Sequence, residues 1–162
     1  MEATTQSNLL AKMILMAWDA QNNYLNKLIS SLTDEQLAKE TAPGKNTGVY
    51  LLGHLIAVSD GMLPLLGFGD RLFPEMEEVF LKTPDKSGKA FPSVTELKQQ
   101  LEAVNTKLNT HFRSTDINGW LDRHTAVSSE DFVKEPHRNK LNVVINRTGH
   151  MAYHIGQMRL IN

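Results

Sequence analysis

Cysteine is absent from all 162 residues of the sequence. Its absence excludes disulfide bonds, thiolate zinc sites and a cysteine nucleophile. The sequence also lacks an excess of either charge, because 17 Lys and Arg residues stand against 18 Asp and Glu residues. A protein that binds nucleic acid normally gathers a basic excess into a patch, and we find none. We therefore expect no disulfides and no nucleic-acid partner.

Signals for export or for a membrane are also missing. Residues 1–5, MEATT, place no basic region before an apolar run, so the N-terminus does not resemble a signal peptide. We find no stretch that approaches the roughly 20 apolar residues needed to cross a bilayer. The sequence therefore predicts a cytoplasmic protein without a membrane partner.

The overall composition is that of a globular protein. Hydrophobic residues make up 41% of the chain and charged residues 22%, a balance that argues against disorder. A chain of this length can bury one sizeable core. We therefore expect residues 1–162 to form a single domain.

Four long segments have the apolar periodicity of helices, and no strand-like alternation lasts for more than a few residues. They span about 5–31, 47–66, 93–114 and 139–160. The third begins with Ser93-Val94-Thr95-Glu96, which matches a capping box. In the first segment the recurring apolar positions are Leu9, Met13, Met16, Ala20, Tyr24 and Leu28. The pattern predicts an all-α fold, a four-helix bundle.

Two long connections interrupt this pattern, at about 67–92 and 115–138. Both contain helix breakers, and the first has room for one short helix around 74–81. Connections of this length in a compact domain often cover or shape a site, and one of them could cross over the bundle. Between the first two long helices, Thr33 or Asp34 could cap a short extra turn.

His150 and His154 form the strongest local chemical signal. Residues four apart on a helix lie about 40° apart and share one face. Two neutral imidazoles at this spacing can chelate one metal ion if a third ligand comes from elsewhere. Taken alone the pair is weak evidence, because it occurs by chance in many helices.

The helix that carries this pair has its main apolar stripe on the opposite side. The stripe consists of Leu141, Val144, Ile145, Thr148, Ala152 and Ile155. The two histidines share their face with Val143, Arg147, Gln157 and Ile161. Such a mixture of polar and aliphatic residues is typical of a half-buried cleft rather than of an open surface.

His54 repeats this placement on the second segment. The apolar stripe there is Leu52, Leu55, Ile56, Leu63 and Leu66, and His54 points away from it. Gly53, Ala57 and Gly61 form a track of small residues beside His54, which would let a neighbouring helix or a ligand approach the backbone closely. A lone histidine in this position is more often hydrogen-bonded than bound to metal.

Two motifs together resemble a known family. VYLLGHL at 49–55 on the second helix and GHMAYHIGQ at 149–157 on the last helix are similar to the motifs of the DinB-like (YfiT-like) metalloproteins. The order of the helices and the positions of both long connections match as well, so the resemblance covers essentially the whole chain.

The resemblance implies a four-helix bundle in which His54, His150 and His154 hold a divalent transition metal. Three protein ligands leave positions open for water or substrate. Zn or Ni is the favoured ion, with Fe, Co and Mn as alternatives. The resemblance further implies a small-molecule substrate, and either transfer of a low-molecular-weight thiol or a hydrolysis. The alternative is a non-catalytic metal-binding bundle that acts as an interaction or structural module.

Three further residues are candidates for supporting this site. Gln157, one turn beyond His154, could hydrogen-bond a ligand or its water. Asp19 and Asp60 could orient a ligand imidazole, although a solvated helix face explains both equally well. The sequence identifies no general base and no other catalytic residue.

The remaining histidines and the tryptophans have simpler interpretations. His111 lies near the end of the third helix, where a cation favours the helix dipole. His124 and His137 fall in the second long connection and are interpreted as solvated. Trp18 and Trp120 are interpreted as core or interface anchors.

Some apolar residues of the second and fourth helices lie outside the main stripes. They are Val58, Leu65, Val143 and Met158. A single core would not cover them all, and large exposed apolar patches usually mark an interface. We therefore expect a homodimer through these helix faces.

Overall fold

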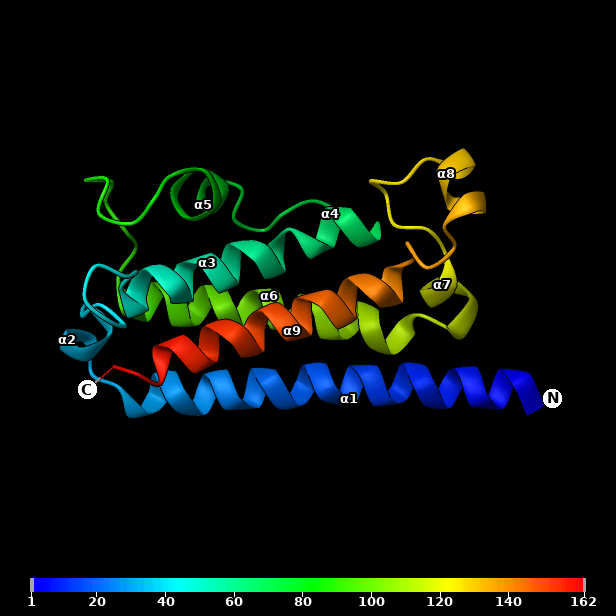
Figure 1. Cartoon of the computed structure of the whole chain (residues 1–162), viewed down its shortest axis with the longest axis horizontal. Coiled ribbons are helices and arrows are strands. Elements are labelled where there is room, and N and C mark those ends of the chain that lie inside the picture. The colour runs from blue at the N-terminus through cyan, green and yellow to red at the C-terminus, as the bar shows by residue number, and fades with distance from the viewer. Residues whose placement is uncertain (1, 162) are drawn as a thin grey trace.

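Long helices lie side by side along most of the molecule (Figure 1). The structure, a computed structural model, describes residues 2–161. The long helices are α1 (Glu2–Ser31), α3 (Gly48–Asp60), α6 (Val94–Ser114) and α9 (Lys140–Met158). Within the described residues there is no β-strand, only isolated bridges. The predicted all-α fold with long connections is confirmed.

Side-chain caps explain where these helices begin. The hydroxyl of Ser93 accepts a hydrogen bond from the backbone of Glu96, and the Glu96 carboxylate accepts one from the backbone of Ser93 at 2.8 Å. The predicted capping box of α6 is therefore confirmed. Thr33 makes the same arrangement at the short helix α2 (Asp34–Leu37). Thr47 and Asn139 cap α3 and α9 through their side-chain oxygens.

The first long connection crosses over the bundle. Helix α3 continues as α4 (Met62–Leu66), which ends at Gly67 in the left-handed conformation, with a φ of 72°. The chain then runs back through α5 (Glu75–Glu77) and a π-helical turn, η1 (Glu78–Lys82), before α6 begins (Figure 1). Helices α3 and α6 therefore run in the same direction, as α1 and α9 do.

The second connection stays at one end of the bundle and contains α7 (Ile117–Leu121) and α8 (Ser129–Lys134) (Figure 1). It is attached to α4, because the Thr125 hydroxyl donates to the backbone oxygen of Pro64 at 3.0 Å. Trp120 of α7 and Trp18 of α1 are both buried in the core, as predicted.

The segment Gly48–Leu66 corrects one sequence expectation. By length and composition it could cross a membrane, with a mean hydropathy of 1.6, so the prediction that no such stretch exists was wrong. Inside the fold, however, 67% of this segment is buried. Its predicted stripe, Leu52, Leu55, Ile56, Leu63 and Leu66, lies in the core. The segment is apolar because it is the central helix of the bundle.

Most of the apolar stripe predicted for α1 faces outward, although Ala20 and Leu28 are half-buried. Leu9, Met13, Met16 and Tyr24 each expose more than half of their surface. The buried apolar side chains of α1 are instead Ala11, Trp18, Leu25 and Ile29. Apolar residues occupy two sides of this helix, so their periodicity alone could not show which side faces the core.

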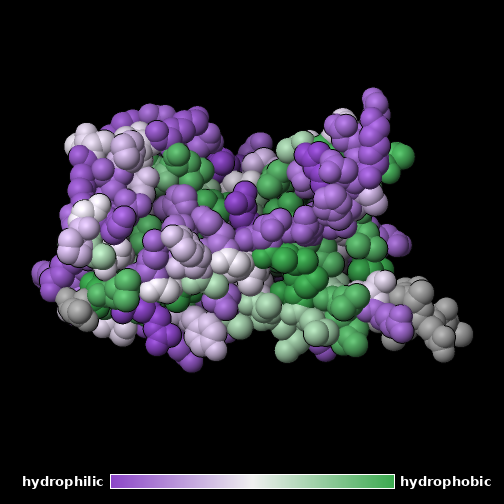
Figure 2. Space-filling model, viewed as in Figure 1, coloured by the Kyte–Doolittle hydropathy of each residue, from purple (hydrophilic) through white to green (hydrophobic). Residues whose placement is uncertain are grey.

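The residues that motivated the homodimer have other places in the fold. Val143 and Met158 are buried in their own chain, and Val58 and Leu65 are half-buried. Ile145, expected in the core, is exposed instead. Hydrophobic side chains gather over part of α1 and the neighbouring α9 in Figure 2. The homodimer stays a prediction, but the four residues from which it was argued no longer support it.

Asp60 fastens the crossover connection to α3. Its carboxylate is fully buried and accepts hydrogen bonds from the backbone of Leu72 at 2.8 Å and of Phe73 at 3.0 Å. Both oxygens are thereby engaged away from the histidines. Both interpretations offered for Asp60, a residue that orients a ligand imidazole or part of a solvated helix face, were wrong, because the carboxylate is buried and the backbone of the connection is its partner.

We expect Asp60→Asn to destabilise the fold. An amide offers one oxygen where the carboxylate offers two, so a buried N–H loses its acceptor. This costs about 1–3 kcal/mol in the free energy of unfolding. Urea unfolding followed by circular dichroism measures the loss. Asp70→Asn, an exposed residue of the same connection, is the control, and an equal effect of both substitutions would contradict the role given to Asp60.

Candidate metal centre

The side chains of His54, His150 and His154 converge between α3 and α9. The Nε2 atoms of His54 and His150 lie 3.3 Å apart, and those of His150 and His154 lie 3.0 Å apart. One ligand nitrogen from each residue lies within 4.8 Å of the others, and all three side chains are half-buried. The structure thus brings together the three histidines that the sequence singled out.

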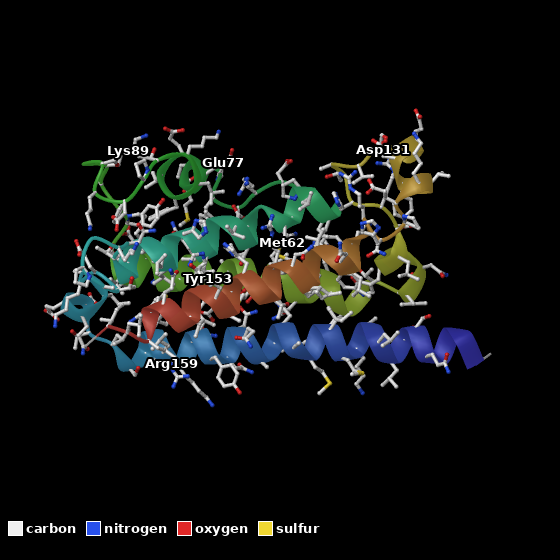
Figure 3. The ribbon with its side chains drawn as sticks, viewed as in Figure 1. Met62, Glu77, Lys89, Asp131, Tyr153 and Arg159 are labelled. Atoms are coloured by element: carbon white, nitrogen blue, oxygen red, sulfur yellow. The ribbon has the colours of Figure 1, made fainter. Side chains whose placement is uncertain are left out.

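His154 is oriented by its own helix. Its Nδ1 lies 2.7 Å from Oε1 of Gln157, and Nε2 of Gln157 donates to the hydroxyl of Tyr153 at 3.2 Å. With the amide in this orientation, Nδ1 of His154 carries the proton and donates it. Nε2 of His154 then has a free lone pair. The predicted contact of Gln157 with the histidines is confirmed, and Tyr153, labelled in Figure 3, is its further support.

His54 is oriented by the crossover connection. Its Nδ1 donates to the backbone oxygen of Phe80 at 2.9 Å. Phe80 lies in η1, and the wider turn of a π-helix occurs frequently at functional sites. The hydroxyl of Tyr50 donates at 2.8 Å to the backbone oxygen of Thr83, just after η1. These bonds hold the connection over the histidines, as expected for a long connection that shapes a site.

Gly53 makes the contact with Phe80 possible. A Cβ at residue 53 would overlap the Phe80 ring, which packs directly on the backbone of α3. At Gly61 a Cβ would come within 2.8 Å of Nη2 of Arg71. The track of small residues beside His54 therefore does admit a close neighbour, as predicted. That neighbour is the crossover connection, through Phe80 and Arg71.

The hydrogen-bonding pattern of the cluster suits a metal ion. A carbonyl and an amide oxygen hold the Nδ1 protons of His54 and His154, so the neutral rings direct bare Nε2 atoms at the Nε2 of His150. A proton on His150 could satisfy only one of these two nitrogens. A cation bound by all three lone pairs satisfies every one of them, and acceptors on the far ring nitrogen are the usual support of histidine ligands.

The surroundings of His150 and His154 favour their neutral form. Burial, the largest cause, and the neighbouring His154, His54 and Arg147 together lower the pKa of His150 to about 4. Burial also lowers the pKa of His154, against a smaller opposing effect of its hydrogen bond with Gln157. Neutral imidazole is the form that binds metal, so protons compete weakly for these two ligands near pH 7.

A family model described as the DinB superfamily matches residues 17–158. This range covers most of the sequence and includes all three histidines. The chain belongs to the DinB superfamily. No curated protein matches the chain. Membership accounts for the helical fold. It is compatible with a metal-binding protein, and the three-histidine group could hold a metal ion.

The other histidines of this DinB-superfamily protein lie outside the cluster. His111 stacks on Phe68, with ring centroids 4.6 Å apart. His124 is half-buried, and its burial lowers its pKa. His137 is exposed. None of these three belongs to the group that could hold a metal among the described residues.

Asp19 does not support the site either. It is exposed on α1 and lines a cavity of about 510 Å³ between α1, α6 and α7, which none of the clustered histidines lines. Of the two interpretations offered for Asp19, a residue that orients a ligand imidazole or part of a solvated helix face, the second is therefore confirmed. The backbone oxygen of Phe80 orients His54 instead. The sequence could not show this contact, because every residue type has a backbone oxygen. Only the glycine before His54 hinted at a close neighbour.

Gly53→Ala tests how His54 is positioned. The added methyl group must displace the Phe80 ring and with it the carbonyl that holds Nδ1 of His54. We expect metal affinity to fall about 10- to 100-fold, the usual effect of losing an outer partner of a ligand. Isothermal titration with Zn²⁺ or Ni²⁺ measures it. The matched control is Gly149→Ala, since this glycine also precedes a clustered histidine but has open space around it. Equal affinities of the two variants would contradict the positioning role.

The metal-free protein should lose stability as the pH falls through a defined range. The unfolded chain protonates His150 near its ordinary pKa of about 6.5, whereas the folded site protonates it only near about 4. Between these values unfolding takes up a proton, so the free energy of unfolding falls as the pH falls. Urea unfolding in excess chelator measures this slope. His150→Gln should flatten it and His137→Gln, at an exposed position, should not; an unchanged slope in His150→Gln would rule out this origin.

Proposed function

We infer that the protein is a metal-dependent enzyme, in which His54, His150 and His154 hold one divalent transition metal. The observation that supports this most strongly is the convergence of the three Nε2 atoms. Two of the rings, those of His54 and His154, are already oriented by hydrogen bonds to Phe80 and Gln157. Zn or Ni is the favoured ion on ligand type, with Fe, Co or Mn as alternatives.

An open coordination position supports an enzyme rather than a structural site. In the part of the chain that the structure describes, the group that could hold a metal contains these three histidines and no fourth His, Asp or Glu. A structural zinc site is normally closed by four protein ligands, whereas catalytic sites keep a position for water or substrate. The absence of cysteine is compatible with this, because a thiol would come from the cosubstrate.

The chemistry that fits such a centre is the activation of a thiol cosubstrate or of water, as in an S-transferase or a hydrolase. A bound divalent ion acts as a Lewis acid and lowers the pKa of the group on its open position. The chain's own contribution is to present three neutral imidazoles in fixed orientations. The hydrogen bonds of His54 and His154 restrict ring rotation, and the half-buried position limits access of water.

The alternative is a non-catalytic bundle that binds metal and serves as an interaction or structural module. Its best support is the exposed apolar side of α1, where Leu9, Met13 and Met16 each expose more than half of their surface. The two functions differ in what they require at the metal. An interaction module needs no exchangeable position, whereas the enzyme must bind a thiol or water there. A screen for thiol transfer with the metal-loaded protein separates them.

His154→Ala should abolish metal binding and leave the helices nearly intact. The stability of the bundle depends on its apolar core. His154 is half-buried and is not part of that core. Elemental analysis of the purified variant should show loss of the bound metal, and circular dichroism should show nearly unchanged helix content. His137→Ala, at an exposed position, is the control and should retain the metal.

Some loss of thermal stability is expected in His154→Ala, because a metal that binds only the folded state stabilises it. This difference from the wild type should vanish when both proteins are unfolded in excess chelator. A loss of about 2–5 kcal/mol that persists without metal, the scale of a core truncation, would identify His154 as a packing residue and refute the ligand assignment.

A further inference from the structure

A cavity of about 360 Å³ adjoins the histidine cluster and has a basic lining. Its walls come from α3 and α4, the crossover connection, the segment before α8, and α9. The lining residues are Val58, Gly61, Pro64, Leu65, Arg71, Leu81, Thr125 and Arg147. In Figure 2 the surface is hollowed between the part that carries α5 and η1 and the part that carries α8. The cavity contains two arginines and no carboxylate.

Its position follows from the helices that carry the ligands. Val58 lies one turn after His54 on α3, and Arg147 lies one turn before His150 on α9. Residues three or four apart on a helix are neighbours on its surface. Leu81 follows Phe80, whose carbonyl holds His54. None of the three histidines lines the cavity, which therefore lies about one helical turn from the cluster, along both helices that supply it.

Arg147 has no partner within the described residues. The structure gives its guanidinium no ion pair and no hydrogen bond, and Nε is buried without an acceptor. Arginine is rarely left in such a position, because a half-buried guanidinium without an acceptor loses hydration and gains nothing in return. Its charge also acts on the cluster, as one cause of the lowered pKa of His150.

Arg71 on the opposite wall is already engaged. Its Nη1 donates to the backbone oxygen of Ala57 at 2.8 Å, and its Nε pairs with Glu77 at 3.2 Å. Glu77, labelled in Figure 3, also pairs with Lys82 at 2.9 Å. Arg71 therefore forms a fixed wall of the cavity, and Arg147 is the arginine with its charge uncompensated.

The charge balance calls for an anion. Three neutral imidazoles do not reduce the charge of a divalent ion, and Arg147 adds a further positive charge one turn away. Like charges in a half-buried place repel each other more strongly than they do in open water. No carboxylate lines the cavity to offset them. A negatively charged ligand would satisfy both the metal and Arg147.

We propose that this cavity binds the carboxylate end of a small organic acid whose other end reaches the three-histidine centre, with Arg147 pairing with the carboxylate. The inference rests on the proposed function for the metal itself. A guanidinium is suited to a carboxylate, with which it can form two parallel hydrogen bonds. Val58, Pro64 and Leu65 provide an apolar wall for a short carbon chain, and the volume is that of a small-molecule site.

The test compares two thiols that differ in charge. Protein loaded with Co²⁺ is titrated with 3-mercaptopropionate and with 3-mercapto-1-propanol, and the thiolate-to-cobalt absorption band reports binding without any turnover. We expect the carboxylate thiol to bind at least about tenfold more tightly, the scale of one charge-assisted hydrogen bond. Arg147→Gln should remove this preference, and Arg147→Lys should retain part of it. Arg159→Gln is the matched control, because Arg159 is exposed at the far end of α9.

Each outcome decides the inference. A preference that is equally large in Arg147→Gln would come from chelation by the carboxylate or from general charge, and would overturn the role of Arg147. Equal affinities for both thiols in the wild type would overturn it as well. If neither thiol gives an absorption band, the thiol-binding function fails instead. Calorimetric titration of the same protein with propionate then decides the carboxylate site alone, which requires binding in the wild type and its loss in Arg147→Gln.

Discussion

The contact between Phe80 and Gly53 determines how the rest of the site is built. A glycine at this position lets the Phe80 ring lie on the backbone of α3, and the Phe80 carbonyl then meets Nδ1 of His54. Further along α3, Arg71 donates to the backbone oxygen of Ala57, and Asp60 accepts from the backbone of the connection. Three contacts on one side of one helix therefore fix the crossover, and the first of them orients a histidine.

The same crossover explains why the cluster lies in a half-buried place. A bundle connected by short loops would leave this side of α3 and α9 open to water. Here η1 covers His54, whereas Arg71 and Leu81 reach the adjoining cavity. Partial burial keeps His150 and His154 neutral, which prepares them for a cation. It also leaves Arg147 beside them without a counter-charge, which prepares the cavity for an anion.

Stability and chemistry are largely separated in this fold. The core is built from the apolar sides of α1, α3, α6 and α9, together with Trp18 and Trp120. The histidines and Arg147 are half-buried and contribute little to that core. Residues of the site can therefore vary with little cost to the fold, which is a general reason why proteins of one fold support different chemistry. The superfamily membership accordingly says more about the architecture and the ligand type than about the substrate.

The local pattern of the sequence was sufficient for several features. The Ser93 capping box, the helical segments and the shared face of His150 and His154 depend on neighbours three or four residues apart, and such neighbours are visible in the sequence. His54 joined this pair through its resemblance to a family motif.

The long-range contacts could not be obtained from the local pattern. Asp60 looked like a partner for histidine and holds backbone instead. The apolar residues of α1 at Leu9 and Met13 looked like core and are exposed. Each of these outcomes depends on which element packs against a given face, and that packing is set by contacts between residues far apart in the chain.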